Sequence, residues 1–246
     1  MVINVIANKI MSVFIQSEWR KLVMINYDVD PKILTPYLPY GTKIDTWNGR
    51  CYMSLVGFMF LNTKLKGIVL PFHQKFEEIN LRFYIKYYDE IDIIRGTVFI
   101  KEIVPKSMVT FVANQLYKEH YETKRMRHYW DINDKNINIE YGFFEDKWQN
   151  IKVNANPNLI DIPPFSEANY ITEHLWGFTK INETETKKYE VEHPKWQQYL
   201  VNDFECSIDF EKTYGRNFKI LNILKPVSVY LIEGSKIKVK NSILHY

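Results

Sequence analysis

The stretch from Phe76 to Lys86, FEEINLRFYIK, decides how the rest of the chain is interpreted. Side chains alternate between the two faces of a β-strand. One face of this strand would carry only apolar groups, those of Ile79, Leu81, Phe83 and Ile85. The other would carry a carboxylate, an amide, a guanidinium and a phenol, those of Glu78, Asn80, Arg82 and Tyr84. A solvent-facing strand would ordinarily carry Lys, Thr and Ser there, so we predict that this polar face lines a pocket.

Glu78 and Arg82 are the main candidates for chemistry on this face. An arginine can bind a carboxylate through two hydrogen bonds, and a neighbouring glutamate can orient it or act as a general acid or base. The alternative is a buried ion pair that satisfies itself. Because an isolated buried charge is costly, pairing is expected under either interpretation. Asn80 and Tyr84 could each satisfy that pair or contact a ligand.

The composition indicates one globular domain over residues 1–246, with residues 1–16 as a loosely held N-terminal segment. Hydrophobic residues make up 46% of the chain and charged residues 25%, and 17 Tyr, 15 Phe and 6 Trp favour β-sheet. The net charge of +3, with both signs interleaved, is too small for a nucleic-acid-binding surface. We therefore expect a globular β protein with no nucleic-acid partner.

The sequence lacks the motifs of several functional classes. The two cysteines, Cys51 and Cys206, stand far apart and are expected to be buried reduced thiols, and no histidine pair has metal-ligand spacing, so we predict no metal and no cofactor. Nucleotide-binding and hydrolase fingerprints are absent from the sequence. There is no apolar run of about 18 residues and no secretory signal. We expect a cytoplasmic protein without a membrane partner.

The chain predicts a mainly antiparallel β fold, a β-rich α+β class with about three short helices. An Asn48-Gly49 turn, the strongest short-range hairpin signal, precedes a strand. A turn is expected at Tyr88-Asp89-Glu90, a loop over 156–165, and a second turn at Gly234-Ser235. Helices are expected at 31–38, 105–119 and 167–173. Strands are expected at 19–27, 51–61, 76–86, 91–104, 121–131, 136–144, 148–154, 175–181, 187–192, 200–210, 226–233 and 236–240.

Several motifs, in order, resemble one family. They are Trp19-Arg20, Asp30 through Pro39-x-Gly41, Asp45 with Asn48-Gly49-Arg50, the polar strand from Phe76 to Tyr84, Thr172-Glu173 and His193-Pro194-x-Trp196. Over residues 17–240 they are similar to the uncharacterised domain-of-unknown-function family 2071, whose fold is similar to acetoacetate decarboxylase. The resemblance implies a cone-shaped β-barrel with a pocket inside it. It implies no activity, because fold carries function only through its site.

The resemblance also implies a difference in chemistry. Acetoacetate decarboxylases use a lysine that forms a Schiff base, beside a second lysine that lowers its pKa, just after the central helix. In the matching stretch of this chain Tyr121 takes the nucleophile position, and Lys118 and Lys124 flank it out of register. Glu78 matches the pocket glutamate of the decarboxylases. Acetoacetate decarboxylase activity is therefore not expected, and Tyr121 is predicted either to line the pocket or to be an ordinary core residue.

Three functions remain open. The first is a binding protein for a small apolar, carbonyl- or carboxylate-containing molecule, with Arg82, Asn80, Tyr84, Tyr121 and Glu173 as ligand-binding residues. The second is an enzyme that acts on a small keto or carboxylate compound through Glu78, without a Schiff base. The third is a structural or partner-binding protein with a filled barrel. The expected partner is a small-molecule ligand, and a homodimer is an open alternative for the assembly.

Overall fold

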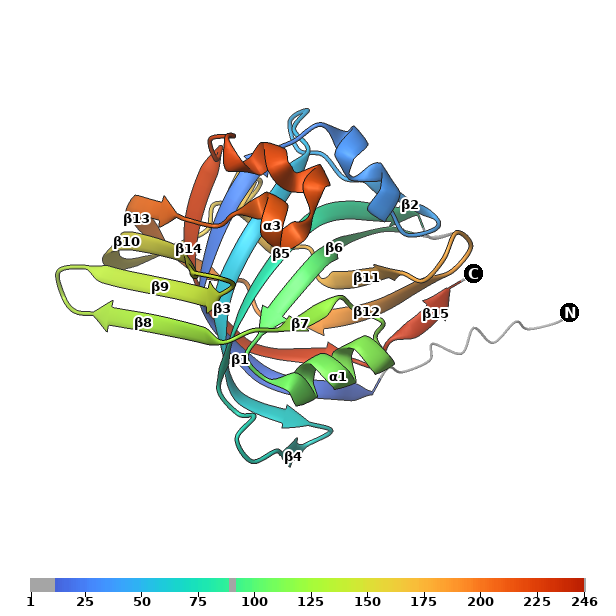
Figure 1. Ribbon diagram of the computed structural model, residues 1–246, viewed down its shortest axis with the longest axis horizontal. Helices are drawn as coiled ribbons and strands as arrows, with labels where there is room; N and C mark the ends of the chain where they lie inside the picture. Colours follow the sequence, from blue (N-terminus) through green and yellow to red (C-terminus); the bar gives the residue numbers. More distant parts are fainter. Residues whose placement is uncertain (1–11, 89–91, 246) are drawn as a thin grey trace, which may run out of the picture.

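The structure, a computed structural model, describes residues 12–88 and 92–245 and consists mostly of β-sheet (Figure 1). The strands are β1 (Val13–Asp28), β2 (Thr42–Ile44), β3 (Tyr52–Leu65), β4 (Ile68–Val69), β5 (Phe76–Tyr88), β6 (Ile93–Val104), β7 (Tyr121–Thr123), β8 (Met126–Ile132), β9 (Ile137–Phe144), β10 (Trp148–Asp161), β11 (Trp176–Lys180), β12 (Thr186–Glu192), β13 (Gln197–Cys206), β14 (Ser228–Lys240) and β15 (Ile243–His245). The helices are α1 (Ser107–Leu116), α2 (Glu167–Thr172) and α3 (Phe210–Tyr214), with 3-10 turns η1 (Pro31–Ile33), η2 (Thr35–Tyr37) and η3 (Arg216–Asn222). No helix in these ranges has the length and hydropathy that crossing a bilayer requires.

Seven strands pair successively into a ring, in the order β12, β11, β6, β5, β3, β1 and β14. The ring closes where β14 pairs with β12 through Val191 and Val239. All of these pairings are antiparallel except β11 with β6, and β7 also lies parallel to β6. The prediction of a mainly antiparallel, β-rich fold with a few short helices is confirmed, and the expected barrel is a ring-like, mixed sheet.

The two faces of β5 lie in two separate hydrophobic cores. Ile79, Leu81 and Phe83 belong to a core outside the ring, which includes side chains of β9, β10 and α3. Phe76 and Tyr84 belong to a second core, which also contains Phe14 of β1 and Tyr189 of β12. Figure 1 shows β8, β9, β10 and β13 on one side of the ring strands. The alternation read from the sequence is thus the alternation between the outer core and the ring interior.

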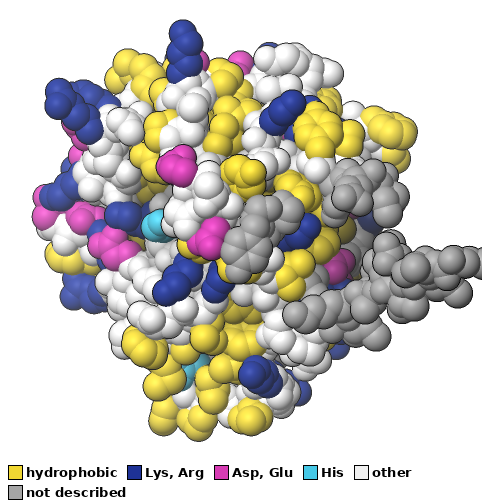
Figure 2. Space-filling model, turned by 90° about the vertical axis from the view of Figure 1, so that its right-hand side faces the viewer, with side chains coloured by type: hydrophobic (Ala, Val, Ile, Leu, Met, Phe, Trp, Pro, Cys, Tyr) yellow, Lys and Arg dark blue, Asp and Glu magenta, His cyan; other side chains and the backbone are white. Residues whose placement is uncertain are grey.

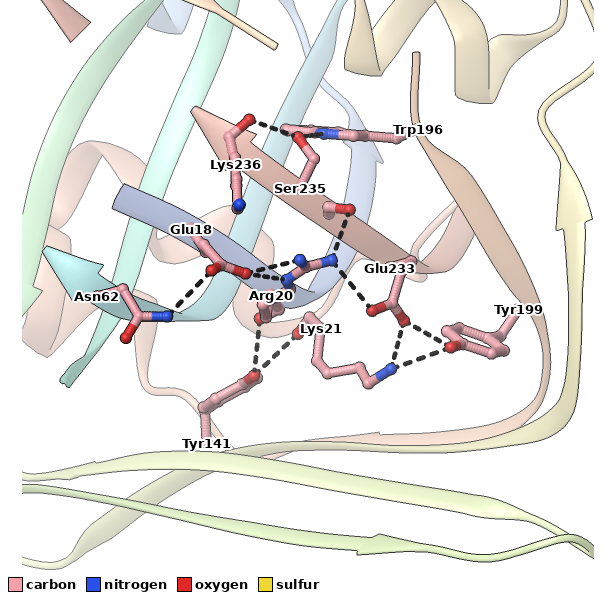
Figure 3. Close-up of polar contacts among 11 residues, drawn as sticks. Glu18, Arg20, Lys21, Asn62, Tyr141, Trp196, Tyr199, Glu233, Ser235 and Lys236 are labelled. Carbon is pink, nitrogen blue, oxygen red and sulfur yellow. Dashed lines mark hydrogen bonds and ion pairs between the residues drawn. The ribbon is translucent and has the colours of Figure 1, made fainter. Parts of the chain in front are cut away.

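The expected turn at Gly234-Ser235 is wrong, because β14 runs without interruption through both residues. Gly234 has φ +77°, and a Cβ on it would lie 2.0 Å from the carbonyl oxygen of Trp19. On the facing strand Lys21 has φ +54°, and the Tyr141 hydroxyl donates to its carbonyl oxygen at 2.9 Å (Figure 3). The glycine therefore permits a close approach of β1 and β14 rather than a chain reversal.

Ion pairs reinforce this irregular crossing (Figure 3). The Lys21 ammonium binds Glu233, and it also donates to the Tyr199 hydroxyl at 3.0 Å. Arg20 binds Glu18 at 2.6 Å and reaches Glu233 at 3.4 Å. The Trp19-Arg20 motif is accordingly part of the junction between β1, β13 and β14.

The expected loop over 156–165 is also wrong in its first half, because β10 continues to Asp161. Pro157 lies where the pairing of β10 with β13 shifts, between Ala155 and Leu159, and beyond the last pair with β9. Proline lacks a backbone N–H, so it is tolerated where the ladder is interrupted.

Other expectations differ in detail. The helix expected at 31–38 is two 3-10 turns, and the strand expected at 121–131 is divided into β7 and β8. Helix α3 and η3 were not anticipated. Val13 to Gln16 already belong to β1, whereas residues 1–11 and the expected turn residues Asp89 and Glu90 lie outside the described residues. Both cysteines are free, but Cys206 is only half-buried.

Replacing Gly234 by Ala tests the close approach of β1 and β14. Gly49→Ala is the matched control, because Gly49 has φ +79° with nothing within 4 Å of its Cβ position. We expect Gly49→Ala to cost about 1–2 kcal/mol, the strain of a left-handed backbone. Gly234→Ala should cost about 1–3 kcal/mol more, because it adds overpacking against backbone. Urea unfolding measures both, and equal losses would contradict the close approach.

Candidate functional site

A cavity of about 160 Å³ lies inside the ring. One part of its wall is aromatic: the Trp19 ring contacts Phe58 with centroids 5.3 Å apart, and Phe60 stacks on Phe76 at 4.6 Å. Another part of the wall is polar and contains Glu78 and its neighbours. The ring interior therefore contains a cavity with one aromatic wall and one polar wall.

Helix α1 forms part of this wall and is unusually exposed. Val109 and Val112 line the cavity, yet no residue of α1 is fully buried. Phe111 and Leu116 are 66% and 49% exposed. Hydrophobic side chains gather at the lower end of the face in Figure 2, the end at which Figure 1 places β4 and α1. Helix α1 therefore forms a thin, largely apolar part of the cavity wall.

Glu78 is the centre of the polar wall. It is 2% exposed, and its two carboxylate oxygens accept hydrogen bonds from Asn80 Nδ2 at 2.9 Å and from the Tyr121 hydroxyl at 3.1 Å. Burial raises the pKa of Glu78 to about 7, although these two hydrogen bonds act in the opposite direction. Glu78 can thus exchange a proton near neutral pH.

Two further buried carboxyl groups, Glu102 and Glu119, line the same cavity. Glu102 lies opposite Asn80 across β5 and β6, and Thr179 donates to Glu119 at 2.8 Å. Burial raises the pKa of Glu119 to about 7. Burial also raises the pKa of Glu102 well above its usual range, and the nearby carboxyl groups of Glu119 and Glu78 raise it further. At neutral pH the three groups therefore share protons rather than carrying three full charges.

Arg82 lines the cavity but does not pair with Glu78. No carboxylate within the described residues lies at ion-pair distance from its guanidinium, and its Nε is buried without an acceptor. The guanidinium carbon lies 5.7 Å from the centre of the Tyr84 ring. The structure therefore does not contain the buried Glu78–Arg82 ion pair that the sequence left as an alternative. Arg82 is a cation at the cavity without a counter-ion among the described residues.

Tyr84 and Glu173 make little direct contact with this cavity. The Tyr84 hydroxyl forms a hydrogen bond of 2.7 Å with Ser54, and Tyr84 is not among the lining residues. Glu173 follows α2 and is half-buried, also outside the lining set. Its neighbour His174 does line the cavity and contacts Asp45 at 3.3 Å. His174, rather than the predicted Glu173, is therefore the residue of this segment that lines the cavity.

Tyr121 lies in the cavity, and the two lysines near it in sequence do not. Lys118 is exposed, and Lys124 binds Glu122 at 3.0 Å and also Glu145. No lysine occurs among the described residues that line the cavity. In the described part of the chain no group of three or more His, Cys, Asp or Glu is arranged to hold a metal ion. The site therefore offers carboxyl, amide, hydroxyl and guanidinium groups.

The sequence interpretation missed Glu102, Glu119 and His174. Glu102 follows Lys101 on β6, and the sequence does not show which of these two charged side chains faces the ring interior without the register of Glu102 to Asn80. Glu119 lies in the charged segment 118–124, which resembles a solvated loop. Only the fold brings it against Thr179, 60 positions later in sequence.

Solved structures with the same fold are acetoacetate decarboxylases and related proteins. One acetoacetate decarboxylase has a TM-score of 0.66 at 9% identity, covering 96% of this chain and 90% of its own. An acetoacetate decarboxylase-like enzyme from Sphingomonas wittichii RW1 gives 0.65 at 8% identity, covering 96% and 94%. The enduracididine biosynthesis enzyme MppR, in complex with pyruvate, gives 0.63 at 11%, covering 97% and 93%. At such identities the likeness shows the fold alone, an acetoacetate decarboxylase-like ring.

The sequence family is narrower than this fold class. The model of the family DUF2071, described as an uncharacterized conserved protein, matches residues 16–236, and the chain belongs to this family. The resemblance read from the motifs is confirmed. The uncharacterized protein YqjF of Bacillus subtilis (strain 168) is 33% identical over 70 residues, a segment that spans 28% of this chain and 29% of that protein.

The raised pKa of Glu119 predicts a pH-dependent effect of Glu119→Gln on stability. Below the unfolded pKa of 4.5 both states are protonated. Between pH 4.5 and about 7 the unfolded chain ionises while the folded chain stays protonated, so this group progressively destabilises the fold as pH rises. Glutamine keeps the acceptor for Thr179 but cannot ionise. Relative to wild type, Glu119→Gln should be neutral at pH 4 and more stable by up to about 3 kcal/mol at pH 8.

Thermal or urea unfolding at both pH values measures this difference. Glu205→Gln, which removes an acid that is 72% exposed, is the control and should show no comparable trend. A constant difference between Glu119→Gln and wild type across the pH range would show that Glu119 ionises normally.

Proposed function

We propose that this protein reversibly binds a small molecule inside the ring, with an apolar body against the aromatic wall and a carboxylate or carbonyl oxygen at Arg82. The observation that carries the proposal is the guanidinium of Arg82, which faces a cavity without a carboxylate partner among the described residues. An arginine in such a position is well suited to bind an oxygen anion through charge-assisted hydrogen bonds. A protein with a purely structural role would be expected to fill its interior instead.

A fold neighbour that binds a small molecule supports a ligand-binding function. MppR, which shares the fold, has been determined with pyruvate, a small keto acid. The aromatic wall of Trp19, Phe58, Phe60 and Phe76 adds apolar surface that a small keto acid alone would not cover. We therefore favour a ligand with a hydrophobic group in addition to its oxygen anion.

A second candidate function is general acid–base catalysis on a small keto or carboxylate compound. Glu78 has a pKa of about 7, and the Tyr121 hydroxyl, 3.1 Å from it, could relay or orient a proton. Because no lysine lines the cavity among the described residues, this chemistry would proceed without a Schiff base. Binding remains the favoured function, since it requires no step beyond the interactions already present.

Arg82→Gln tests the binding proposal. Ligand screening by thermal shift and native mass spectrometry should find carboxylates that stabilise wild type, and Arg82→Gln should lose at least tenfold in affinity for them. The variant should fold, because removing a cation without a counter-ion relieves a desolvation penalty. Arg127→Gln is the matched control, because Arg127 is a half-exposed arginine outside the cavity that contacts Glu140, Asn150 and Trp148. Unchanged affinity in Arg82→Gln would refute the assignment.

Borohydride trapping with keto acids separates the covalent and non-covalent alternatives. We expect no lysine adduct by mass spectrometry, because Lys118 and Lys124 do not line the cavity. A stable adduct on either lysine would restore the Schiff-base mechanism. If turnover of any keto acid is found, Glu78→Gln should abolish it, and turnover that survives would exclude Glu78 from the mechanism.

A further inference from the structure

Three buried oxygen atoms in the polar wall have no protein hydrogen-bond donor among the described residues. They are Oδ1 of Asn80, Oε2 of Glu102 and Oε2 of Glu119. The three side chains are 1%, 2% and 6% exposed, and all of them line the cavity. A buried acceptor without a donor costs free energy, which a ligand with suitable donors can recover.

Three donors near these oxygens are already engaged. Asn80 Nδ2 and the Tyr121 hydroxyl both donate to Glu78, and the Thr179 hydroxyl donates to the other oxygen of Glu119. No lysine lines the cavity among the described residues. When Glu102 and Glu119 are ionised, the wall formed by Asn80, Glu102 and Glu119, the acceptor wall, therefore offers hydrogen-bond acceptors in excess of donors.

We propose that the acceptor wall binds a protonated primary amine of the ligand. An ammonium group carries three N–H donors, which matches three free acceptor oxygens on three side chains. Its positive charge favours the ionised forms of Glu102 and Glu119, so the ammonium group would take the place of the protons that these buried carboxyl groups share at neutral pH. The inference rests on the proposed binding function and deepens it, because it names a second polar group of the same ligand.

The position of Arg82 allows a single ligand to place an amine at the acceptor wall and an oxygen anion at Arg82. Arg82 lies two residues beyond Asn80 on the same face of β5, a spacing of about 7 Å along a strand. A small molecule with an amine at the acceptor wall and a carboxylate or carbonyl at Arg82 can span that distance. The substrate class is thus a small amino compound with an apolar group and an oxygen anion.

Other head groups fit the acceptor wall less well. A hydroxyl group supplies one donor for three acceptors, and a carboxylate supplies none and would meet like charge. The cavity volume of about 160 Å³ is close to the roughly 150 Å³ of an engineered cavity that binds benzene. Benzylamine, benzyl alcohol and benzoate therefore make a matched set of probes, one ring with three head groups.

Isothermal titration calorimetry at pH 7.0 with these three probes tests the inference. We expect benzylamine to bind wild type at least tenfold more tightly than benzyl alcohol. Glu102→Gln should lose at least tenfold in affinity for benzylamine and stay within twofold for benzyl alcohol. Glu205→Gln removes the same charge from the exposed surface and should change neither affinity.

The outcomes separate the inference from the proposed function. If benzyl alcohol or benzoate binds and benzylamine does not, the amine inference fails while ligand binding in the cavity stands. If benzylamine binds equally to wild type and Glu102→Gln, the acceptor wall is not its site and the inference also fails. If none of the three binds, both fail. The comparison of probes on wild type needs no variant, so it holds even if Glu102→Gln does not fold.

Discussion

The closure of β14 onto β12 is the constraint on which the site depends. This pairing converts an open sheet into a ring, and the ring then buries Glu78, Asn80 and Tyr84 on one face of β5. Without closure, Glu78 and Asn80 would be ordinary polar residues on the outside of a sheet. With closure they are 2% and 1% exposed, and their hydrogen bonds must be met inside the cavity.

Desolvation then determines the chemistry of the site. Burial is the largest influence on Glu78, Glu102 and Glu119, and it raises the pKa of each. Three acids in one small cavity reinforce this effect, because ionising one makes the next more difficult. The stability lost at neutral pH is a cost that a structural core would avoid by using apolar residues. The three acids lie at the cavity rather than in the outer core, and this position favours a functional role.

The sequence predicted the fold class and part of the site, and the reason for its limits is specific. Period-two alternation identifies which side chains of one strand share a face, so Glu78, Asn80 and Arg82 were found together on a cavity wall. It contains no information on register between strands, so the contribution of Glu102 could not be assigned. A positive-φ glycine signals either a turn or a close approach, and at Gly234 the wrong alternative was chosen. The prolines after Asn154 predict a loop, because proline disfavours a paired strand, yet β10 continues through Pro157 to Asp161.

Tyr121, which the family resemblance aligns with the decarboxylase nucleophile, links these points. A lysine there would bring an amine into the cavity from the protein, and that amine could hydrogen-bond to the neighbouring acids. Tyr121 instead uses its one hydroxyl donor on Glu78, which leaves oxygens of Glu102 and Glu119 without a donor among the described residues. Tyr121 therefore supplies no amine to the cavity, and buried acceptor oxygens of Glu102 and Glu119 keep no donor among the described residues. The proposed ligand would supply the amine that the protein does not place in this cavity.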